Sequence, residues 1–462
     1  MRRVLAAVTM ALFLQVAAIH AADEQTIDSR LSELEKRLKA LEEREQQRAV
    51  EAEETEKSEM TVELEELRRQ VGILAEEVEK MRSGEEGVEI TQERASSLGL
   101  GPSAASVYRK QSGVSIAGYG EMLYSNFADQ NQSGTPVDKI SNLDFLRAIF
   151  YAGYRFNDRF LFNSEIEVEH ATTDKSGSAS VEFAYVEYLI NKNLTARGGM
   201  LLVPMGFVNE FHEPNVFLGA LRPRTEQVIM PTTWRENGFG VTGSYGPLNF
   251  RTYLVNGLDA GGFSAGGFRG GRQKGSKAKA GDMAFVARGD LNPTPGIVIG
   301  GSIYHGGSDH GQFKTDIGKL DLGTTIWEVH GEAKFRGWDL RGLLAGSHLQ
   351  NAGLFNELKG LSGSDGIAES MRGGYLQLGY NLLSGHHESM GLTPYYRFES
   401  VDTQHKMPVG FFSDPANNQD FHTLGFEFKP IYNIVIKTDY QWLQNGAKTG
   451  LNQFNIGLGY SF

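Results

Sequence analysis

The chain has 462 residues, of which 22% are charged, 40% are hydrophobic and 56 are glycine, with a formal net charge of -12 and no cysteine. The absence of cysteine excludes disulfide scaffolds, thiolate metal sites and cysteine nucleophiles. The acidic balance disfavours nucleic acid as a partner, because phosphate binding requires a basic surface. A mean hydropathy of -0.33 and the lack of a second apolar run of about 20 residues beyond the first segment exclude a polytopic helical membrane protein.

Residues 1–22 have the composition of a secretory signal peptide. Two arginines precede an apolar stretch at residues 4–18, and two small residues follow at Ala21 and Ala22. Export machinery reads the positive start and the short apolar core, and signal peptidase reads the small residues. We therefore predict that this segment is cleaved and that the protein works outside the cytoplasm. The alternative is an uncleaved anchor.

Residues 23–82 carry two stretches of apolar residues at heptad spacing. The members are Ile27, Leu31, Leu34, Leu38 and Leu41, and then Met60, Leu64, Leu67, Val71, Leu74, Val78 and Met81. A polar run between the stretches breaks the register. So narrow an apolar stripe cannot be buried by one helix alone, so we predict a periplasmic coiled coil between copies of the chain. Leucine at the a positions argues against a dimer and is compatible with a trimer. The alternative is a single charged helix lying on another domain.

Residues 83–113 lose the heptad pattern and gain serine and glycine. This composition is typical of a linker. We therefore predict that a separate domain begins at residue 114.

From residue 114 onward, apolar and polar residues alternate. In residues 160–169, Phe160, Phe162, Ile166 and Val168 alternate with Asn163, Glu165, Glu167 and Glu169, and residues 325–335 and 434–442 repeat the pattern. A period of two predicts strands with one apolar face. Such strands occur both in soluble sandwiches and in membrane barrels, so the period alone leaves both open.

The lengths of the connections distinguish these two classes. Short turns are predicted at residues 157–159, 191–193, 245–248, 292–296, 336–337, 384–389 and 429–432, and long loops at 128–142, 171–180, 204–236, 258–282, 306–323, 350–371, 402–420 and 443–451. Their alternation gives about 16 antiparallel strands of about ten residues, which is how outer-membrane barrels are built. Lipid cannot satisfy the edge of an open sheet, so we predict an all-β transmembrane barrel over residues 114–462.

The last predicted strand supports this interpretation. Its apolar face consists of Phe454, Ile456, Leu458, Tyr460 and Phe462. A terminal phenylalanine of this kind looks like the signal that outer-membrane assembly machinery recognises.

Six stretches carry a family resemblance. They read VYRKQSGVSIAGYGEML, GYRFNDRFLFNSEIEVEH, VPMGFVNEFHEPNVF, MPTTWRENGFG, LTPYYRFESVDTQ and KPIYNIVIKTDYQW. These stretches resemble bacterial outer-membrane porins related to the phosphate-selective porin O and P family, over residues 107–462. The resemblance implies a trimeric barrel of about 16 strands, with an N-terminal coiled coil and with the third long loop folded into the lumen. It also implies phosphate selectivity through arginine ladders and lysine clusters, whereas the strands here carry a carboxylate row and no long lysine cluster.

The third long loop, residues 204–236, is the candidate pore constriction. Its candidate charged residues are Glu210, His212, Glu213, Arg222, Arg224, Glu226, Arg235 and Glu236. Charges on a loop inside a narrow pore set ion preference through their field. Large apolar residues such as Phe207, Phe211 and Trp234 need a surface to pack against, which favours a loop inside the pore. The alternative is a solvated surface loop.

Alternation also predicts which strand residues line the lumen wall. These are Arg147, Arg155, Glu165, Glu167, Glu169, Arg197, Glu328 and Glu332. Three glutamates on one strand face repel each other, so we expect the arginines of the adjoining strands to lie beside them. The alternative is an internal salt-bridged wall without a role in transport.

Two further groups of residues have alternative interpretations. The loop at 258–282 carries Arg269, Arg272, Lys274, Lys277 and Lys279, which suit an anion funnel, a contact with lipopolysaccharide phosphates, or a solvated flexible loop. His330 with Glu328, and His386 with His387 and Glu388, are the candidates for acid-base or metal chemistry. Lumen alternation accounts for the first pair and a short turn for the second. We therefore expect no enzymatic activity, no metal and no cofactor.

The sequence thus predicts an outer-membrane porin that forms a water-filled channel for passive diffusion of small hydrophilic solutes or ions. Its expected partners are outer-membrane lipid and lipopolysaccharide, two further copies in a homotrimer, and peptidoglycan through the coiled coil. The alternatives are a structural tether between outer membrane and cell wall, and an anion-selective or phosphate-selective porin. From the carboxylate row we expect a weak cation preference at low salt.

Overall fold

The computed structural model describes residues 24–48, 99–171, 177–315, 318–386 and 390–462. The chain divides into two units, residues 1–89 and 90–462, which are described separately. The predicted signal peptide, the second heptad stretch and residues 83–98 of the predicted linker lie outside the described residues, as do His387 and Glu388.

In the first unit, residues Glu24–Arg48 form helix α2. The apolar positions Leu31, Leu34, Leu38 and Leu41 are all half-buried, while most positions between them are exposed. Arg37 and Glu33 form an i,i+4 ion pair at 3.2 Å on its surface. The helix agrees with the first heptad stretch, and its association with other copies remains a prediction. No helix among the described residues is long and apolar enough to cross a membrane.

The second unit is built from antiparallel strands. The barrel strands are β1 (Gly113–Phe127), β2 (Asn142–Arg155), β3 (Phe160–Glu169), β4 (Ala179–Asn191), β5 (Leu194–Leu202), β6 (Arg235–Tyr245), β7 (Leu248–Asn256), β8 (Met283–Thr294), β9 (Ile297–Gly307), β12 (Gly323–Phe335), β13 (Trp338–Leu349), β14 (Ser370–Tyr380), β15 (Gly391–Lys406), β16 (Asn418–Ile431), β17 (Ile434–Asn445) and β18 (Gln453–Ser461). Strands β10 (Lys314–Thr315) and β11 (Gly318–Lys319) form a separate small hairpin in a long loop.

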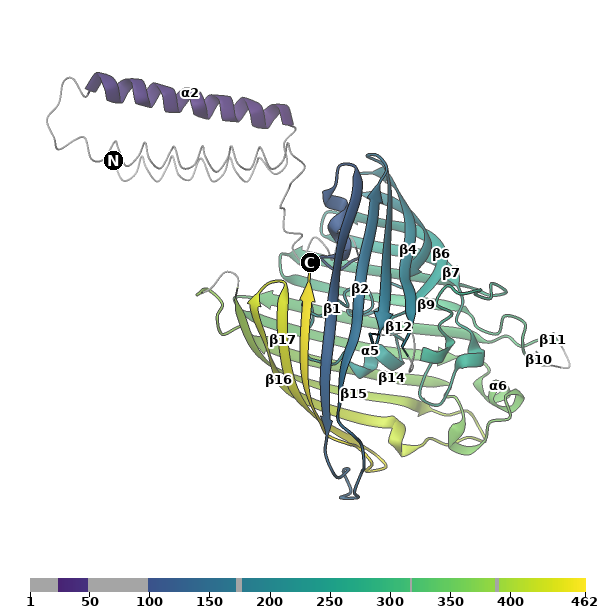
Figure 1. Ribbon diagram of the computed structural model, residues 1–462. Coiled ribbons are helices and arrows are strands. Elements are labelled where there is room, and N and C mark those ends of the chain that lie inside the picture. The colour runs from purple at the N-terminus through teal and green to yellow at the C-terminus, as the bar shows by residue number, and fades with distance from the viewer. Residues whose placement is uncertain (1–23, 49–98, 172–176, 316–317, 387–389) are drawn as a thin grey trace. The chain divides into compact units, whose positions relative to one another are not determined.

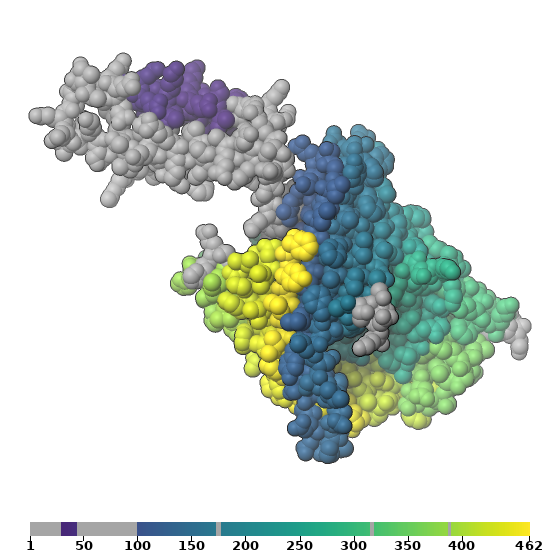
Figure 2. All heavy atoms as spheres, in the orientation of Figure 1, coloured from purple at the N-terminus to yellow at the C-terminus, as the bar shows by residue number. Residues whose placement is uncertain are grey.

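Each barrel strand pairs with its neighbours in the chain, and β1 pairs with β18, so the sheet is closed. The closing seam runs from Tyr119↔Ser461 to Phe127↔Gln453. Figures 1 and 2 show the yellow C-terminal strand lying directly beside blue β1. Closure pairs the edges that an open sheet would leave free. The predicted closed barrel of 16 strands is thereby confirmed.

The connections also agree with the prediction from sequence. Short turns at one rim join β2 to β3, β4 to β5, β6 to β7, β8 to β9, β12 to β13, β14 to β15 and β16 to β17, and long loops join the strands at the other rim. Strand lengths run from 9 residues in β5 to 16 in β15. The short helices lie in the connections: α5 (Arg224–Val228), α6 (Ala352–Leu358), η2 (Ala260–Gly262), η3 (Arg269–Gly271), η4 (Gly363–Asp365) and η5 (Pro415–Asn417).

The outer face of the barrel is apolar, with aromatic side chains toward both rims. Exposed aromatic residues near the short turns are Tyr154, Phe156, Phe160, Tyr245, Phe335, Trp338, Tyr432 and Tyr460; those nearer the long loops are Phe285, Trp327 and Trp442. Between them lie aliphatic side chains such as Val329, Leu344 and Leu376. An apolar band between two aromatic girdles is the surface that a membrane barrel presents to lipid.

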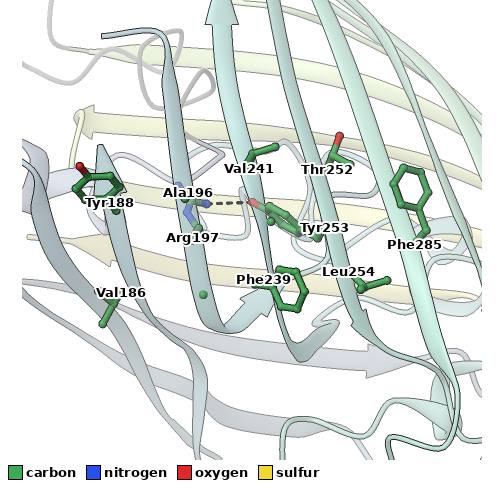
Figure 3. A pocket seen from close by; sticks show the side chains of 12 residues that line it. Val186, Tyr188, Ala196, Arg197, Phe239, Val241, Thr252, Tyr253, Leu254 and Phe285 are labelled. Atoms are coloured by element: carbon green, nitrogen blue, oxygen red, sulfur yellow. Dashed lines mark hydrogen bonds between the residues drawn. The ribbon is translucent and has the colours of Figure 1, made fainter. Parts of the chain in front are cut away.

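The two faces of the wall separate along single strands. Figure 3 shows Arg197 of β5 and Tyr253 of β7 meeting through a hydrogen bond of 3.2 Å, among outward residues such as Phe239 and Phe285. Phe239 is 60% exposed and Phe285 is 47% exposed, whereas Arg197 and Tyr253 are buried. Apolar side chains therefore point outward from the barrel, and inward residues carry the polar groups.

The predicted linker at 83–113 differs from the structure over its C-terminal part. Residues 104–109 form the 3-10 helix η1 (Ala104–Arg109), and Leu100, Ala104, Ala105 and Val107 are each at most 3% exposed. This segment precedes β1, whose first residue, Gly113, lies opposite Arg155 at the short-turn rim. It is packed against the inner wall, as its contacts below establish. Its small residues, which suggested a linker, are those that fit a narrow space.

Candidate functional site

The connection from β5 to β6, residues 203–234, is the candidate functional element, and we call it the constriction loop. The loop contacts strands on different sides of the barrel: the His212 side chain meets β3, and the carbonyl oxygens of Gly206 and Phe217 accept hydrogen bonds from β8 and β17. A loop that touches opposite walls of a closed barrel must cross its lumen. Figure 1 shows its helix α5 within the ring of strands. The fold of the third long loop into the lumen agrees with what the family resemblance implied.

The first part of the loop is held to β3 and β7. His212 Nε2 lies 3.0 Å from Glu165 Oε1, and His212 Nδ1 lies 2.9 Å from the carbonyl oxygen of Asn209. Glu210 forms an ion pair with Arg251 at 3.3 Å. All of these side chains are buried. Buried charges need such partners, because transfer from water to a low-dielectric interior is costly.

The second part of the loop is held to β15 and β17 through its backbone. Lys437 Nζ donates to the carbonyl oxygens of Phe217 and Gly219 at 2.6 and 3.1 Å. The carboxylate of Asp439 accepts from the amide of Ala220 at 2.7 Å. Arg397 donates to the carbonyl oxygen of Leu221 at 3.2 Å, and Glu399 accepts from the amide of Thr225 at 2.5 Å. Charged wall side chains therefore take the place of the secondary structure that would otherwise satisfy this loop backbone.

Glu226 joins the two parts of the loop. Its carboxylate accepts from the amide of Val208 and from the hydroxyl of Tyr375, each at 2.7 Å. Gly206 adopts a positive φ of 68° beside this carboxylate, where an added Cβ would lie 2.5 Å from Glu226 Oε2. Glycine is therefore required both by the backbone conformation and by the space available.

Arg235 and Glu236, predicted as loop residues, are the first residues of β6. Arg235 pairs with Glu182 at 2.6 Å. Glu236 accepts from the indole of Trp234 at 3.2 Å and from the amide group of Asn256 at 2.6 Å. Both residues are buried, so they fix the end of the constriction loop and do not line open water.

The carboxylate row of β3 lies on the lumen side as predicted, but it is covered. Glu165 is 0% exposed and Glu167 is 2% exposed. Arg147 lies 3.2 Å from Glu121 and 3.5 Å from Glu167, while Glu165 is paired with His212. Covered and paired charges project a weak field into water, so the expectation of a cation-preferring wall loses its physical basis.

The other predicted wall residues have separate roles. Glu169 accepts from the hydroxyl of Ser178 at 2.8 Å near the long-loop rim. Arg197 pairs with Glu187 at 2.9 Å instead of with the β3 glutamates. Arg155 lies at the short-turn rim, where it donates to the carbonyl oxygens of residues 157 and 158, and its assignment to the lumen wall remains a prediction. Its position follows from the end of β2, where the lumen opens to the rim.

Glu328 and Glu332 of β12 also belong to ion networks. Glu328 accepts from Ser302 at 2.6 Å and lies 2.8 Å from His330 Nδ1. The other ring nitrogen of His330 lies 2.9 Å from Asp290. Glu332 is paired with Arg341 and with Lys334. His330, a candidate for acid-base chemistry, is thus enclosed between two carboxylates in the wall.

Sequence reasoning missed several wall residues that hold the constriction loop. These are Arg251, Arg288, Arg341, Arg397, Glu399, Lys437 and Asp439. Each occupies an inward position of a strand, so the alternation of apolar and polar residues could have predicted that its side chain points into the barrel. The constriction-loop residues that they contact lie about 40 to 220 residues away along the chain and could not be predicted from that local pattern.

Water-exposed charge near the loop is positive. Arg222 and Arg224 are half-buried and line a cavity of about 280 Å³ together with the buried carboxylate Glu399 and with Gln419, Gln441 and Gln453. Arg222 Nη2 has no hydrogen-bond partner among the described residues. The loss of surrounding water lowers the pKa of both guanidinium groups. The cavity is therefore lined by arginines whose desolvation a bound anion would offset.

The basic loop at 258–282 packs onto the constriction loop from the long-loop side. Arg272 donates to the carbonyl oxygens of Thr232 and Thr233 at 2.9 and 2.7 Å. Burial of Phe263 and Phe268 shows that the loop is not fully solvated. Arg269 is exposed, and its pKa is lowered by partial loss of water and by the positive charges of Arg272, Arg222 and Arg224. Arg269 thus adds to the positive field at this entrance.

A second cavity, of about 260 Å³, opens near the short turns. It is lined by Phe207 and Phe211 of the constriction loop and by Arg288, Glu332, Lys334 and Arg341 of the wall. The guanidinium carbon of Arg341 lies 4.6 Å from the ring centre of Phe207. Cavities therefore flank the constriction loop on both of its sides.

No family model matches the chain. A protein of Aquifex aeolicus (strain VF5), described as an uncharacterized protein, is 34% identical over 353 residues, which are 74% of this chain and 78% of that protein.

Among solved structures, the outer membrane channel DcaP of Acinetobacter baumannii is 13% identical, with a TM-score of 0.48 and coverage of 76% and 97% of the two chains. The anion-selective porin from Comamonas acidovorans is 12% identical, with a TM-score of 0.46 and coverage of 76% and 100%. At these identities, and with TM-scores below 0.5, the likeness is weak, and the barrel is established by its own strand pairing.

Proposed function

We propose that the chain, which belongs to one family with the uncharacterized Aquifex aeolicus protein, is an outer-membrane porin that conducts small hydrophilic solutes by passive diffusion. One observation carries the proposal: a closed barrel of 16 strands presents an apolar, aromatic-girdled face outward and charged side chains inward. Such a surface is stable only in a membrane, and such an interior is stable only around water or polar protein. Barrels of this strand number enclose an aqueous path.

The two rims give the orientation. Outer-membrane barrels place short turns in the periplasm and long loops outside the cell. The cavity lined by Arg222 and Arg224 then faces the outside, and the cavity beside Phe207 and Arg341 faces the periplasm. Solutes would meet the arginine-lined entrance first, and then the constriction loop.

We further propose a preference for anions. The carboxylates Glu165 and Glu167 are covered and paired, whereas Arg222, Arg224 and Arg269 keep partial access to water. At physiological salt the Debye length is about 8 Å, so charges at the narrow part decide selectivity more than charges behind protein. This replaces the weak cation preference expected from the sequence.

The test is reversal potential across planar bilayers under a potassium chloride gradient. Wild-type protein should conduct and show an anion-selective potential that weakens with salt. R222Q/R224Q should move the potential toward cations, with a change in permeability ratio of about twofold or more. Arg155→Gln is the matched control, because Arg155 lies at the short-turn rim and bonds only backbone carbonyls.

Two results would contradict this proposal. A cation-selective wild type, or a double variant indistinguishable from Arg155→Gln, would remove the anion preference. Properly inserted barrels that pass no current, including after removal of the constriction loop, would remove the channel itself and favour a structural tether.

We also propose an assembly: a homotrimer in outer-membrane lipid and lipopolysaccharide, with residues 23–82 as a periplasmic coiled coil that reaches toward peptidoglycan. The heptad spacing of Leu31, Leu34 and Leu38 on α2 supports self-association of this helix. The finer division into a signal peptide at 1–22 and a linker at 83–98 belongs to the same proposal.

A peptide of residues 23–82 should be helical and oligomeric, and its melting temperature should rise with concentration. Association and folding are linked when the apolar seam is buried only between copies. Sedimentation equilibrium and circular dichroism give the measurement, and Leu34→Asp is the matched variant that should dissociate it. A concentration-independent helical monomer would exclude self-association.

A further inference from the structure

Residues 99–109, which we call the lumen segment, sit inside the barrel beneath the constriction loop. The amides of Ser103 and Ala104 donate to Glu213 Oε1 at 2.9 and 3.2 Å. The side chain of Asn163 on β3 donates to the carbonyl oxygen of Ala104 at 2.9 Å. The segment therefore contacts the loop and the inner wall together.

Further contacts extend along the wall. Tyr108 donates to Glu187 at 2.7 Å on β4, and Ser106 Oγ lies 2.8 Å from Ser115 Oγ on β1. An added Cβ at Gly99 would collide with Arg251 and Glu210, and one at Gly101 would collide with Glu213. The lumen segment thus reaches from β1 to the base of the constriction loop.

The way this segment is held differs from the way a strand is held. Its backbone bonds are internal, from Ala105 to Gly101, from Ser106 to Ser103 and from Lys110 to Val107. The hydrogen bonds above between the segment and the rest of the barrel all use at least one side chain. Withdrawal would therefore break side-chain contacts and leave the β-ladder of the barrel whole.

The docked state also carries a cost. Glu213 is 1% exposed, and its Oε2 has no hydrogen-bond partner among the described residues. Burial raises the pKa of Glu213 to about 7. The unsatisfied oxygen makes the free energy of docking less favourable, because withdrawal of the lumen segment would let water hydrate the Glu213 carboxyl.

From these contacts we propose that residues 99–109 are a releasable stopper of the periplasmic half of the lumen, gripped by the constriction loop at Glu213. The proposal rests on the channel function proposed above. The stopper covers the half of the lumen bounded by β1 to β4 and β7, and its small residues allow it to leave without unfolding the wall. The stopper lies in the chain between the N-terminal part and β1. A force that pulls on the N-terminal part would therefore also pull on the stopper.

Two sets of variants of the full chain test the stopper in planar bilayers. Gly101→Val should dock poorly, because a side chain there would overlap Glu213 and push its carboxylate away from Ser103 and Ala104, so the conductance should rise at least about twofold. Lys110→Val is the matched control, since Lys110 is exposed just beyond the segment. S106C/S115C can close a disulfide, and the chain has no other cysteine.

The disulfide variant should stay at a low conductance level when oxidised and gain transitions to a higher level when reduced. Equal conductance of folded Gly101→Val and wild type would overturn the stopper, because the segment would then obstruct nothing. A raised conductance of Gly101→Val with identical traces for oxidised and reduced S106C/S115C would overturn its release and leave a fixed narrowing. Failure of every variant to conduct would contradict the channel function instead.

Discussion

Deletion of Phe462 should remove most of the folded, membrane-inserted barrel. The backbone of Phe462 exchanges two hydrogen bonds with Gly118, from the Gly118 amide at 3.0 Å and to the Gly118 carbonyl at 2.9 Å. These bonds extend the β1–β18 seam beyond Tyr119↔Ser461. Loss of the residue leaves two backbone groups of β1 unsatisfied at about 1–3 kcal/mol each, and more where lipid replaces water.

The side chain of Phe462 can be separated from its backbone. Its ring lies against Gly118, where an added Cβ would come within 2.8 Å of the ring. Phe462→Ala keeps both seam hydrogen bonds and loses only the ring. It should therefore refold in detergent nearly as well as wild type, and its insertion in cells should be reduced if the terminal aromatic is recognised during assembly.

The measurement is heat-modifiable mobility on gels, after refolding in detergent and after expression in cells. Full recovery of the deletion variant in both settings would show that neither the terminal seam bonds nor a terminal signal contributes. Wild-type recovery of Phe462→Ala in cells would remove the aromatic signal alone. Tyr154→Ala, an exposed outward residue near the same rim, controls for loss of any aromatic ring.

The strands and turns could be predicted because their signal is local. Alternation at Phe160, Phe162, Ile166 and Val168 reports directly which side of the wall each residue faces. Short turns such as that between β12 and β13 need only two residues and leave little freedom of register. The pairing of β1 with β18 could be predicted because lipid offers no hydrogen-bond partner for the backbone N–H and C=O groups of an unpaired edge strand.

The candidate site could be predicted only in part. The sequence located the charged loop, yet the partners of its residues come from distant positions, as with His212 and Glu165 or Ala220 and Asp439. Alternation says that a side chain points inward but not whether another segment covers it. Alternation therefore predicted that Glu165 faces open water and contributes an electric field there, whereas the constriction loop covers it.

The lumen segment shows why composition misleads. Ser103, Gly101 and Gly99 have the small size and flexibility of linker residues. The same small size is required where backbone approaches Glu213 and Arg251 closely. Composition indicates the conformational freedom of the unfolded chain. Whether this freedom is lost on folding depends on packing, here against the constriction loop.

Removal of the constriction loop should change conduction more than any substitution of its charges. Replacement of residues 206–232 by a short glycine-serine connection would empty the lumen between the β3 wall and the β17 wall, which the loop now bridges through His212 and Phe217. Conductance should rise at least about threefold, because a barrel of 16 strands without an internal loop encloses a wide aqueous channel. Selectivity should fall at the same time, since Arg222 and Arg224 leave with the loop.

The truncated barrel must also remain folded for this result to count. Its strand ladder is independent of the loop, so heat-modifiable mobility should persist, and wall charges that lose loop partners, such as Lys437 and Asp439, would be hydrated by the water that fills the emptied lumen. Unchanged conductance of a folded, truncated barrel would mean that the narrowest point lies elsewhere, and the lumen segment would be the next structure to remove. A rise only after both are removed would place the two elements in series along one pore.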